Sequence, residues 1–295
     1  MTEALAAAGR APARARKFPI IGWVGLGIVA VFVGVAVAAP WISPYGPVER
    51  AVQTVQPPSR HDLLGTNQIG QDILSQVIAG ARVSLLMALL AGGGSVVIGS
   101  VVGLTAGWQG GWPDVVLMRI TDLFLALPRL PLLIVLGAYA GRSFTTLALV
   151  IAAIFWPGTA RVLRGQVQSL RRRVHVKAAL GFGAGSLHVM RRHIVPDIGL
   201  VLVASLVAAA GRAILLEAGL AFLGLGDPTR TSWGSIMRDA RQSQSIFYTN
   251  IWTWWMLPPI VAIVLLLLGM TFLGVALEQR INPRLARHSV ARGAA

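Results

Sequence analysis

Few residues of this chain could carry chemistry, and their spacing supports no catalytic or metal site. The histidines are scattered, and His188 and His193 are five residues apart, which places them on different faces of a helix. No serine–histidine–aspartate set or pair of carboxylates has a spacing typical of hydrolysis. The chain has no cysteine, which excludes thiolate zinc sites, iron–sulfur clusters, disulfides and cysteine nucleophiles. We therefore expect no catalytic residue, metal or cofactor in this chain.

The two lysines also exclude one common energy-converting motif. A Walker A loop holds nucleotide phosphates through a lysine that is followed by serine or threonine. Here Lys17 precedes Phe18 and Lys177 precedes Ala178. Any process in this system that uses ATP should therefore depend on another chain, which would hold ATP and magnesium, and we expect this chain not to be an enzyme.

Five charged residues, in contrast, stand inside long apolar runs, where a charge needs a partner or a cavity. On insertion scales, a charge at mid-membrane depth costs roughly 2.5–3.5 kcal/mol. Arg119 and Asp122 are three residues apart on one helix and could pair with each other. The other three are Arg129, Arg212 and Glu217.

The elements that must position these residues are membrane-spanning helices. The 295 residues are 55% hydrophobic and only 13% charged, against about 25% charged in an average soluble domain. Buried strands of a soluble sheet are about 4–8 residues long, whereas the apolar runs here reach about 20 or more. We predict an all-α membrane protein with six spans, at residues 18–39, 83–108, 115–139, 144–162, 198–225 and 252–277.

The predicted organisation follows from these runs. A basic tail (1–17) precedes the first helix (18–39), which we expect to stay uncleaved because it exceeds the 7–15 residues of a signal-peptide core. A loop (40–82) leads to a five-helix core (83–277) that contains a long basic segment (163–197), and a second basic tail (278–295) ends the chain. In the second run, Ser95, Gly99, Gly103 and Gly107 recur every four residues, which predicts close packing of another helix.

The distribution of basic residues predicts the orientation. If both termini are cytoplasmic, the inner segments hold 16 of the 26 lysines and arginines, and the outer loops hold seven over a longer stretch. Positive charge is retained on the cytoplasmic side of membrane proteins, and this accounts for the net charge of +15 without nucleic acid. We predict a multi-pass protein of the bacterial inner membrane with both termini inside the cell.

The segment between the fourth and fifth runs should be the functional part of the cytoplasmic face. Residues 176–197 (VKAALGFGAGSLHVMRRHIVPD) combine short apolar helical pieces with glycines and carry no acidic residue before Asp197. Apolar side chains on a cytoplasmic loop need a cover. That cover could be a groove on another protein or the lipid surface, and spacing alone favours neither.

The same segment resembles the EAA signature of bacterial ABC importer permeases, which reads Glu-Ala-Ala, three residues, Gly, ten residues, Ile-x-Pro. The matching residues are Ala178, Ala179, Gly183, Ile194 and Pro196, and the family's glutamate is Lys177 here. Residues 61–67 (HDLLGTN), 80–85 (GARVSL), 215–226 (LLEAGLAFLGLG) and 282–285 (NPRL) are similar to motifs of the peptide/nickel branch, specifically its second permease subunit.

The resemblance implies a type I ABC importer permease and a role for this loop. Residues 163–197 would couple the chain to cytoplasmic ATPases, through Lys177, Ala178, Ala179, Leu180, Phe182, Gly183, Ile194 and Pro196. The implied partners are a second permease subunit, two ATPase subunits and an extracytoplasmic substrate-binding protein. Short peptides are the implied substrate, with nickel or another small solute as the alternative.

Arg129 and Arg212 could then belong to the translocation path. Each lies about 15 residues beyond the inner start of its run, so both reach a depth of about 22 Å. Our hypothesis is that they meet a substrate carboxylate or Glu217, and helix–helix pairing is the alternative. A secondary transporter would show internal repeats, and a membrane-embedded enzyme would need a catalytic constellation. We find neither pattern.

Overall fold

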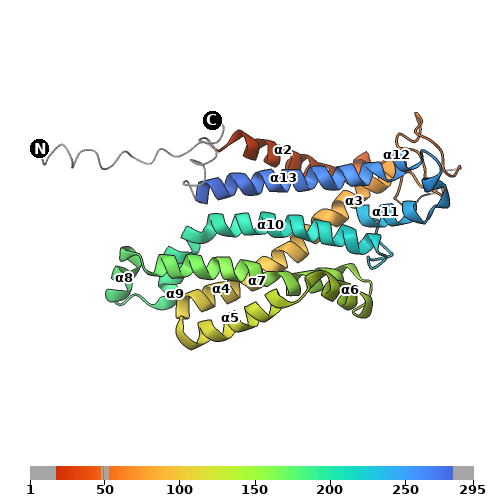
Figure 1. Ribbon diagram of the computed structural model, residues 1–295. Helices are drawn as coiled ribbons and strands as arrows, with labels where there is room; N and C mark the ends of the chain where they lie inside the picture. The colour runs from red at the N-terminus through yellow and green to blue at the C-terminus, as the bar shows by residue number, and fades with distance from the viewer. Residues whose placement is uncertain (1–17, 48, 50–52, 282–295) are drawn as a thin grey trace, which may run out of the picture.

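The computed structural model describes residues 18–47, 49 and 53–281, and these residues form a helical bundle. Figure 1 shows most helices lying along one common axis, with α8 and the first turn of α2 at one end and α11 and α12 at the other. Within the described residues no strand occurs, and the sole β-type pairing is an isolated bridge between Thr66 and Asp72. The predicted all-α class is confirmed. The tail 1–17 and residues 282–295 of the second tail, including the predicted 282–285 motif, lie outside the described residues.

Most helices follow one another with short connections, and the longest connection, residues 43–72, joins α2 to α3. Their bounds are α2 Ile20–Ile42, α3 Ile73–Met87, the π-helical turn η1 Ala88–Gly92, α4 Gly93–Gln109, α5 Gly111–Ala126, α6 Arg129–Tyr139, α7 Phe144–Arg171, α8 Val174–Gly181, α9 Ser186–Val189, the π-helical turn η2 Met190–Ile194, α10 Val195–Phe222, α11 Trp233–Gln242, the 3₁₀ turn η3 Gln244–Phe247, α12 Trp252–Trp255 and α13 Leu257–Ile281.

The described part of the structure has five or six candidate spans, against the six predicted. Five helical stretches are long and apolar enough to cross a membrane, and α5 with α6 make a sixth if they are counted as one bent span. The two axes differ by 87°. Pro128 caps α6, and a proline disfavours helical geometry in the residue before it, here Leu127, which is extended with ψ 139°. The third predicted span (115–139) is therefore broken at Pro128.

Several predicted boundaries are wrong, because a continuous apolar run ends where polar side chains interrupt a helix, although the helix itself continues. The predicted loop 40–82 ends ten residues too late, since α3 begins at Ile73 and continues through η1 and α4 to Gln109 as one 37-residue stretch. Asp72 starts this helix by accepting a hydrogen bond from the Ser75 N–H at 2.8 Å. At the other side of the core, α7 extends to Arg171, so residues 163–171 of the predicted loop are helical.

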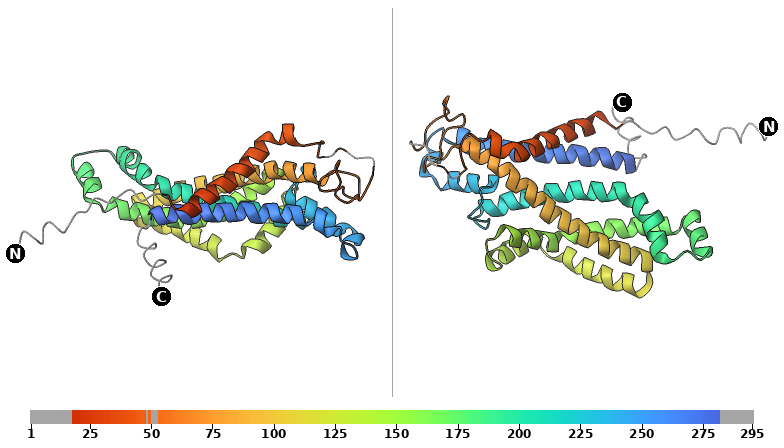
Figure 2. Two further views of the ribbon diagram at one scale, coloured as in Figure 1. Left: turned by 90° about the horizontal axis from the view of Figure 1, so that it is seen from above. Right: turned by 180° about the vertical axis from the view of Figure 1, so that it is seen from behind.

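The bundle is held together by close helix contacts at small residues. A Cβ atom at Gly103 would lie 2.5 Å from the Ala160 carbonyl oxygen of α7, and one at Gly99 would lie 2.7 Å from that of Trp156. The predicted packing role of the small-residue stripe is confirmed. Figure 2 shows the continuous α3–α4 stretch crossing from the side of α2 and α13 to the side of α5 and α7.

Candidate functional site

The segment predicted to contact a partner forms a short helical projection at one end of the bundle, where Figure 1 shows α8 and α9. Three of its side chains, Val176, Val189 and Ile194, are fully buried and join an apolar cluster with Leu163 and Val167 of α7 and Ile198 of α10. These residues fix the projection to the bundle. Ile194 therefore acts here as an internal anchor.

Other apolar side chains of the projection face outward without cover. Phe182 is 93% exposed, Val174 83% and Leu187 66%. Lys177, Ala178, Gly183 and Pro196 are exposed as well, whereas Ala179 and Leu180 are half-buried. The predicted coupling residues thus divide into an outward surface and an inner set that supports it.

A turn that requires glycine sets the direction of this outward surface. Gly183 has φ +86°, a left-handed conformation that side chains other than glycine rarely adopt. Its N–H donates to the Leu180 carbonyl at 3.0 Å, and the Ala184 N–H donates to the Ala179 carbonyl at 3.1 Å. This is the Schellman pattern that ends a helix, and it leaves Phe182 at the tip.

Two contacts that sequence spacing did not reveal tie the projection together. The rings of His175 in α8 and His193 in η2 have centroids 6.0 Å apart. Arg173 contacts the Asp197 carboxylate at 3.4 Å, an exposed ion pair that spans the projection from its first to its last turn. Neither pair has a regular sequence separation, because the intervening turn decides which residues meet.

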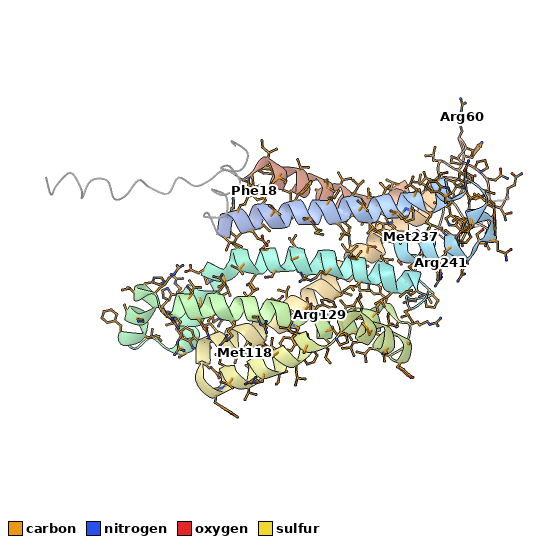
Figure 3. The ribbon with its side chains drawn as sticks, viewed as in Figure 1. Phe18, Arg60, Met118, Arg129, Met237 and Arg241 are labelled. Carbon is orange, nitrogen blue, oxygen red and sulfur yellow. The ribbon has the colours of Figure 1, made fainter. Side chains whose placement is uncertain are left out.

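The second candidate site is a cavity of about 490 Å³ between α6, α7, α10 and α13. Arg129 and Arg212 both line it, together with Phe155, Gln166, Ser205 and Glu278. Figure 3 shows Arg129 near the middle of the bundle's length. The guanidinium of Arg129 stacks over the Phe155 ring, 5.2 Å from its centroid. The structure thus brings together the two arginines that share a predicted depth.

Glu217 does not reach this cavity. Its side chain is 3% exposed, lies beside Asp227 and Ser232 near the opposite end of α10, and accepts a hydrogen bond from the Ser232 hydroxyl. The second carboxylate oxygen has no partner among the described residues. Five helical residues separate Arg212 from Glu217, which turns them about 140° apart around the axis. Glu217 therefore belongs to the packing between α10 and the following loop.

Asp227 fixes that loop to the start of α7. Its carboxylate accepts hydrogen bonds from the Phe144 N–H at 3.0 Å and from the Thr229 N–H and hydroxyl at 2.9 and 2.6 Å. Burial opposes ionisation, but these hydrogen bonds and the nearby Arg230 outweigh it and hold the pKa of Asp227 below its usual value. The loop carries a fixed negative charge at neutral pH.

Two ion pairs join α5 to α7. Asp114 accepts two hydrogen bonds from Arg164, at 2.5 and 2.6 Å, in a bidentate arrangement. Asp122 pairs with Arg161, so the expected pairing of Arg119 with Asp122 is wrong. Helices α5 and α7 are adjacent, so Asp122 pairs with an arginine of α7 and not with Arg119 of its own helix.

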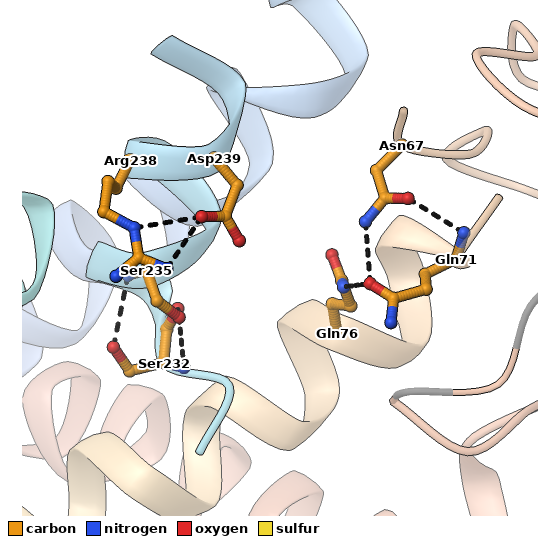
Figure 4. Close-up of polar contacts among 7 residues, drawn as sticks. All are labelled: Asn67, Gln71, Gln76, Ser232, Ser235, Arg238 and Asp239. Carbon is orange, nitrogen blue, oxygen red and sulfur yellow. Dashed lines mark hydrogen bonds and ion pairs between the residues drawn. The ribbon is translucent and has the colours of Figure 1, made fainter. Parts of the chain in front are cut away.

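At the far end of the bundle, the motif residues form a polar network that shapes the loop (Figure 4). Asn67 donates to Gln71 at 2.9 Å and Gln76 donates to the same side-chain oxygen at 2.8 Å. Nearby, Ser232 and Ser235 cap α11 reciprocally. The indole of the fully buried Trp233 donates to the Val77 carbonyl at 2.9 Å and packs where a Cβ at Gly80 would clash at 2.6 Å.

Comparison with known proteins identifies the family. Residues 99–287 match the family described as binding-protein-dependent transport system inner membrane component, and residues 21–62 match the N-terminal TM domain of oligopeptide transport permease C. A Brucella suis protein named as a candidate peptide transport system permease is 34% identical over 274 residues, which is 92% of this chain and 89% of that protein. The dipeptide transport system permease DppC of Alkalihalophilus pseudofirmus is 32% identical over 264 residues, 89% of this chain and 85% of its own length.

The matches cover the helical core and the first span, and they confirm the resemblance found in the sequence. A match of this extent fixes the family, and the fold described above is that of a multi-pass membrane permease. The chain therefore belongs to the inner membrane components of binding-protein-dependent transport systems, and it is a permease subunit of an ABC importer.

Proposed function

We propose that this chain forms half of the translocation path of an importer for short peptides. Its relatives are named for peptide and dipeptide transport, which favours peptides over nickel or another small solute. A second permease subunit would complete the path, and a substrate-binding protein would deliver peptides to the loops around Trp233 and Asp227. Both termini would then be cytoplasmic.

The projection built on α8 would couple this path to two cytoplasmic ATPases, which would bind ATP and magnesium. The observation that carries this proposal is the uncovered apolar surface of the projection, on which Phe182 is 93% exposed. Exposed apolar side chains at the tip of a rigid helical turn are typical of a protein contact. The basic residue Lys177 on the same exposed face would meet an acidic residue of the ATPase, or no charge at all.

Co-purification with the ATPases tests this coupling. A phenylalanine side chain that becomes buried when the two proteins dock contributes about 1.5–3 kcal/mol to binding. Phe182→Ser should therefore weaken ATPase binding about 10- to 100-fold. Phe247→Ser is the matched control, because Phe247 is 71% exposed but lies in η3 near the opposite end of the bundle.

Two outcomes would contradict the proposal. Undiminished ATPase binding by Phe182→Ser would remove the projection as the contact, and loss of binding by Phe247→Ser alone would reverse the orientation. Lys177→Glu reports on charge: unchanged assembly and transport would show that the basic residue has no part in docking. Uptake of labelled peptides, compared with uptake of nickel, decides the substrate.

A further inference from the structure

The cavity between α6, α7, α10 and α13 carries its two positive charges at the same depth. Phe155, over which Arg129 stacks, lies 11 residues from Phe144 at the start of α7, and Arg212 lies 10 residues from Phe222 at the end of α10. Phe144 bonds to Asp227, which follows α10 closely, so these two helix ends are at one level. Both arginines therefore stand about 15 Å from that end, and both line the same cavity.

No acidic side chain neutralises these charges within the described residues, where neither Arg129 nor Arg212 forms an ion pair. The one acidic residue of the lining, Glu278, lies far along the cavity. A Cβ at Gly274 would lie 4.0 Å from Val207, and α10 and α13 run antiparallel from this contact. Arg212 is five residues beyond Val207 and Glu278 four beyond Gly274, which separates them by about 13 Å along the axes.

The break in the third span adds to the positive end of the cavity. Arg129 is the first residue of α6, so the helix begins at the cavity wall and its partial positive charge lies there. The break also leaves main-chain groups without helical partners at mid-depth, and such backbone is tolerated in a membrane where it lines a water-filled cavity. Half-helices that begin at the midplane recur in transporters where an anionic group is bound.

We propose that Arg129 and Arg212 bind the terminal carboxylate of a peptide during its passage, with the amino end directed toward Glu278. This inference rests on the proposed peptide-importer function. Arginine suits the role, because its fork of donors matches a carboxylate in a bidentate arrangement. An extended tetrapeptide spans about 13 Å, which fits the separation between the two charged ends of the cavity.

Equilibrium binding to the purified complex of this chain, its partner permease and the ATPases tests the proposal without interference from the binding protein. The probes are one labelled tetrapeptide with a free carboxylate and the same tetrapeptide as its C-terminal amide. We expect the wild-type complex to bind the acid about tenfold or more tightly than the amide, and the double variant Arg129→Gln/Arg212→Gln to bind both alike. Arg119→Gln is the matched control, since Arg119 is an exposed arginine of α5 that does not line the cavity.

The outcomes separate this inference from the function on which it rests. Absence of acid binding by the wild-type complex, a preference that survives in the double variant, or an equal loss of acid and amide binding would each overturn the carboxylate site. Peptide uptake by the complete wild-type importer in proteoliposomes is measured in parallel. If the wild-type importer takes up peptides although the carboxylate site is overturned, the proposed importer function still holds. If the double variant does not assemble, the single variant Arg212→Gln at an exposed position is judged by the same ratio.

Discussion

The close contact between α4 and α7 predicts a measurable difference between two glycine-to-alanine substitutions in one helix. In Gly103→Ala the new Cβ meets the Ala160 carbonyl oxygen at 2.5 Å and the Leu163 Cβ at 3.0 Å, so the α7 backbone must move. In Gly93→Ala no atom lies within 4 Å of the new Cβ. Alanine favours a helix by about 1 kcal/mol over glycine in both variants, and this gain cancels in the comparison. Overpacking then makes Gly103→Ala less stable than Gly93→Ala by about 1–3 kcal/mol.

The assay is unfolding of the purified chain in mixed micelles with increasing denaturing detergent, followed by the fluorescence of its nine tryptophans. A difference of about 1–3 kcal/mol corresponds to about a 5- to 150-fold change in the ratio of folded to unfolded protein. Circular dichroism of the same samples checks that both variants have the same helix content before unfolding. Equal transition midpoints for the two variants would refute the argument, because they would mean that α4 and α7 do not approach as closely as described.

Three further perturbations have defined outcomes. Gly183→Val places a β-branched residue at φ +86°, which should disorder the α8 turn and uncouple ATP hydrolysis from transport while helix content stays unchanged; normal coupling would contradict the role of this turn. Asp227 has a lowered pKa in the folded chain. Its contribution to the free energy of unfolding is complete above the pKa of the unfolded chain, about 3.9, and is lost as the pH falls through the lower pKa of the folded chain. Amide exchange at Phe144 should therefore accelerate at acidic pH, and Asp227→Asn should remove this pH dependence. Arg164→Ala leaves the Asp114 carboxylate without its bidentate partner and should destabilise the chain by about 1.5–3 kcal/mol, because Arg164 is partly exposed and Gln168 still donates to Asp114; a double-mutant cycle with Asp114→Ala should return a coupling energy above about 1 kcal/mol.

The sequence was sufficient for the helical class and for close packing of another helix on the small-residue stripe of α4, which the structure identifies as α7. Long apolar runs and a four-residue repeat of small side chains are local signals, and both report directly on the lipid and on a neighbouring helix. The start of α3 was not predicted, because it gives no such local signal. Ser75 and Gln76 are buried in a polar network beside the Asp72 cap, and they interrupt the apolar residues at the start of this helix, so that no continuous apolar run marks it.

The candidate sites divide in the same way. Depth along a helix can be counted from its start, and this count predicts one level for Arg129 and Arg212, which line the same cavity. The direction of a side chain around the helix can also be counted, and this would have separated Glu217 from Arg212. The partner of Asp122 could not be found in this way, since Arg161 is 39 residues distant and only the packing of α5 on α7 brings it near.

The unbroken stretch from Ile73 to Gln109 also makes the position of the bilayer measurable. At a rise of 1.5 Å per residue, 37 residues extend about 55 Å, whereas the hydrocarbon layer is about 30 Å thick, so even at a tilt of about 40° roughly 15 Å of this one helix stands among headgroups and water. The chain has no native cysteine. Single thiols introduced one turn at a time along this helix can therefore be labelled without background, and the two positions where a water-soluble reagent ceases to react would mark both membrane boundaries on a single rigid scale.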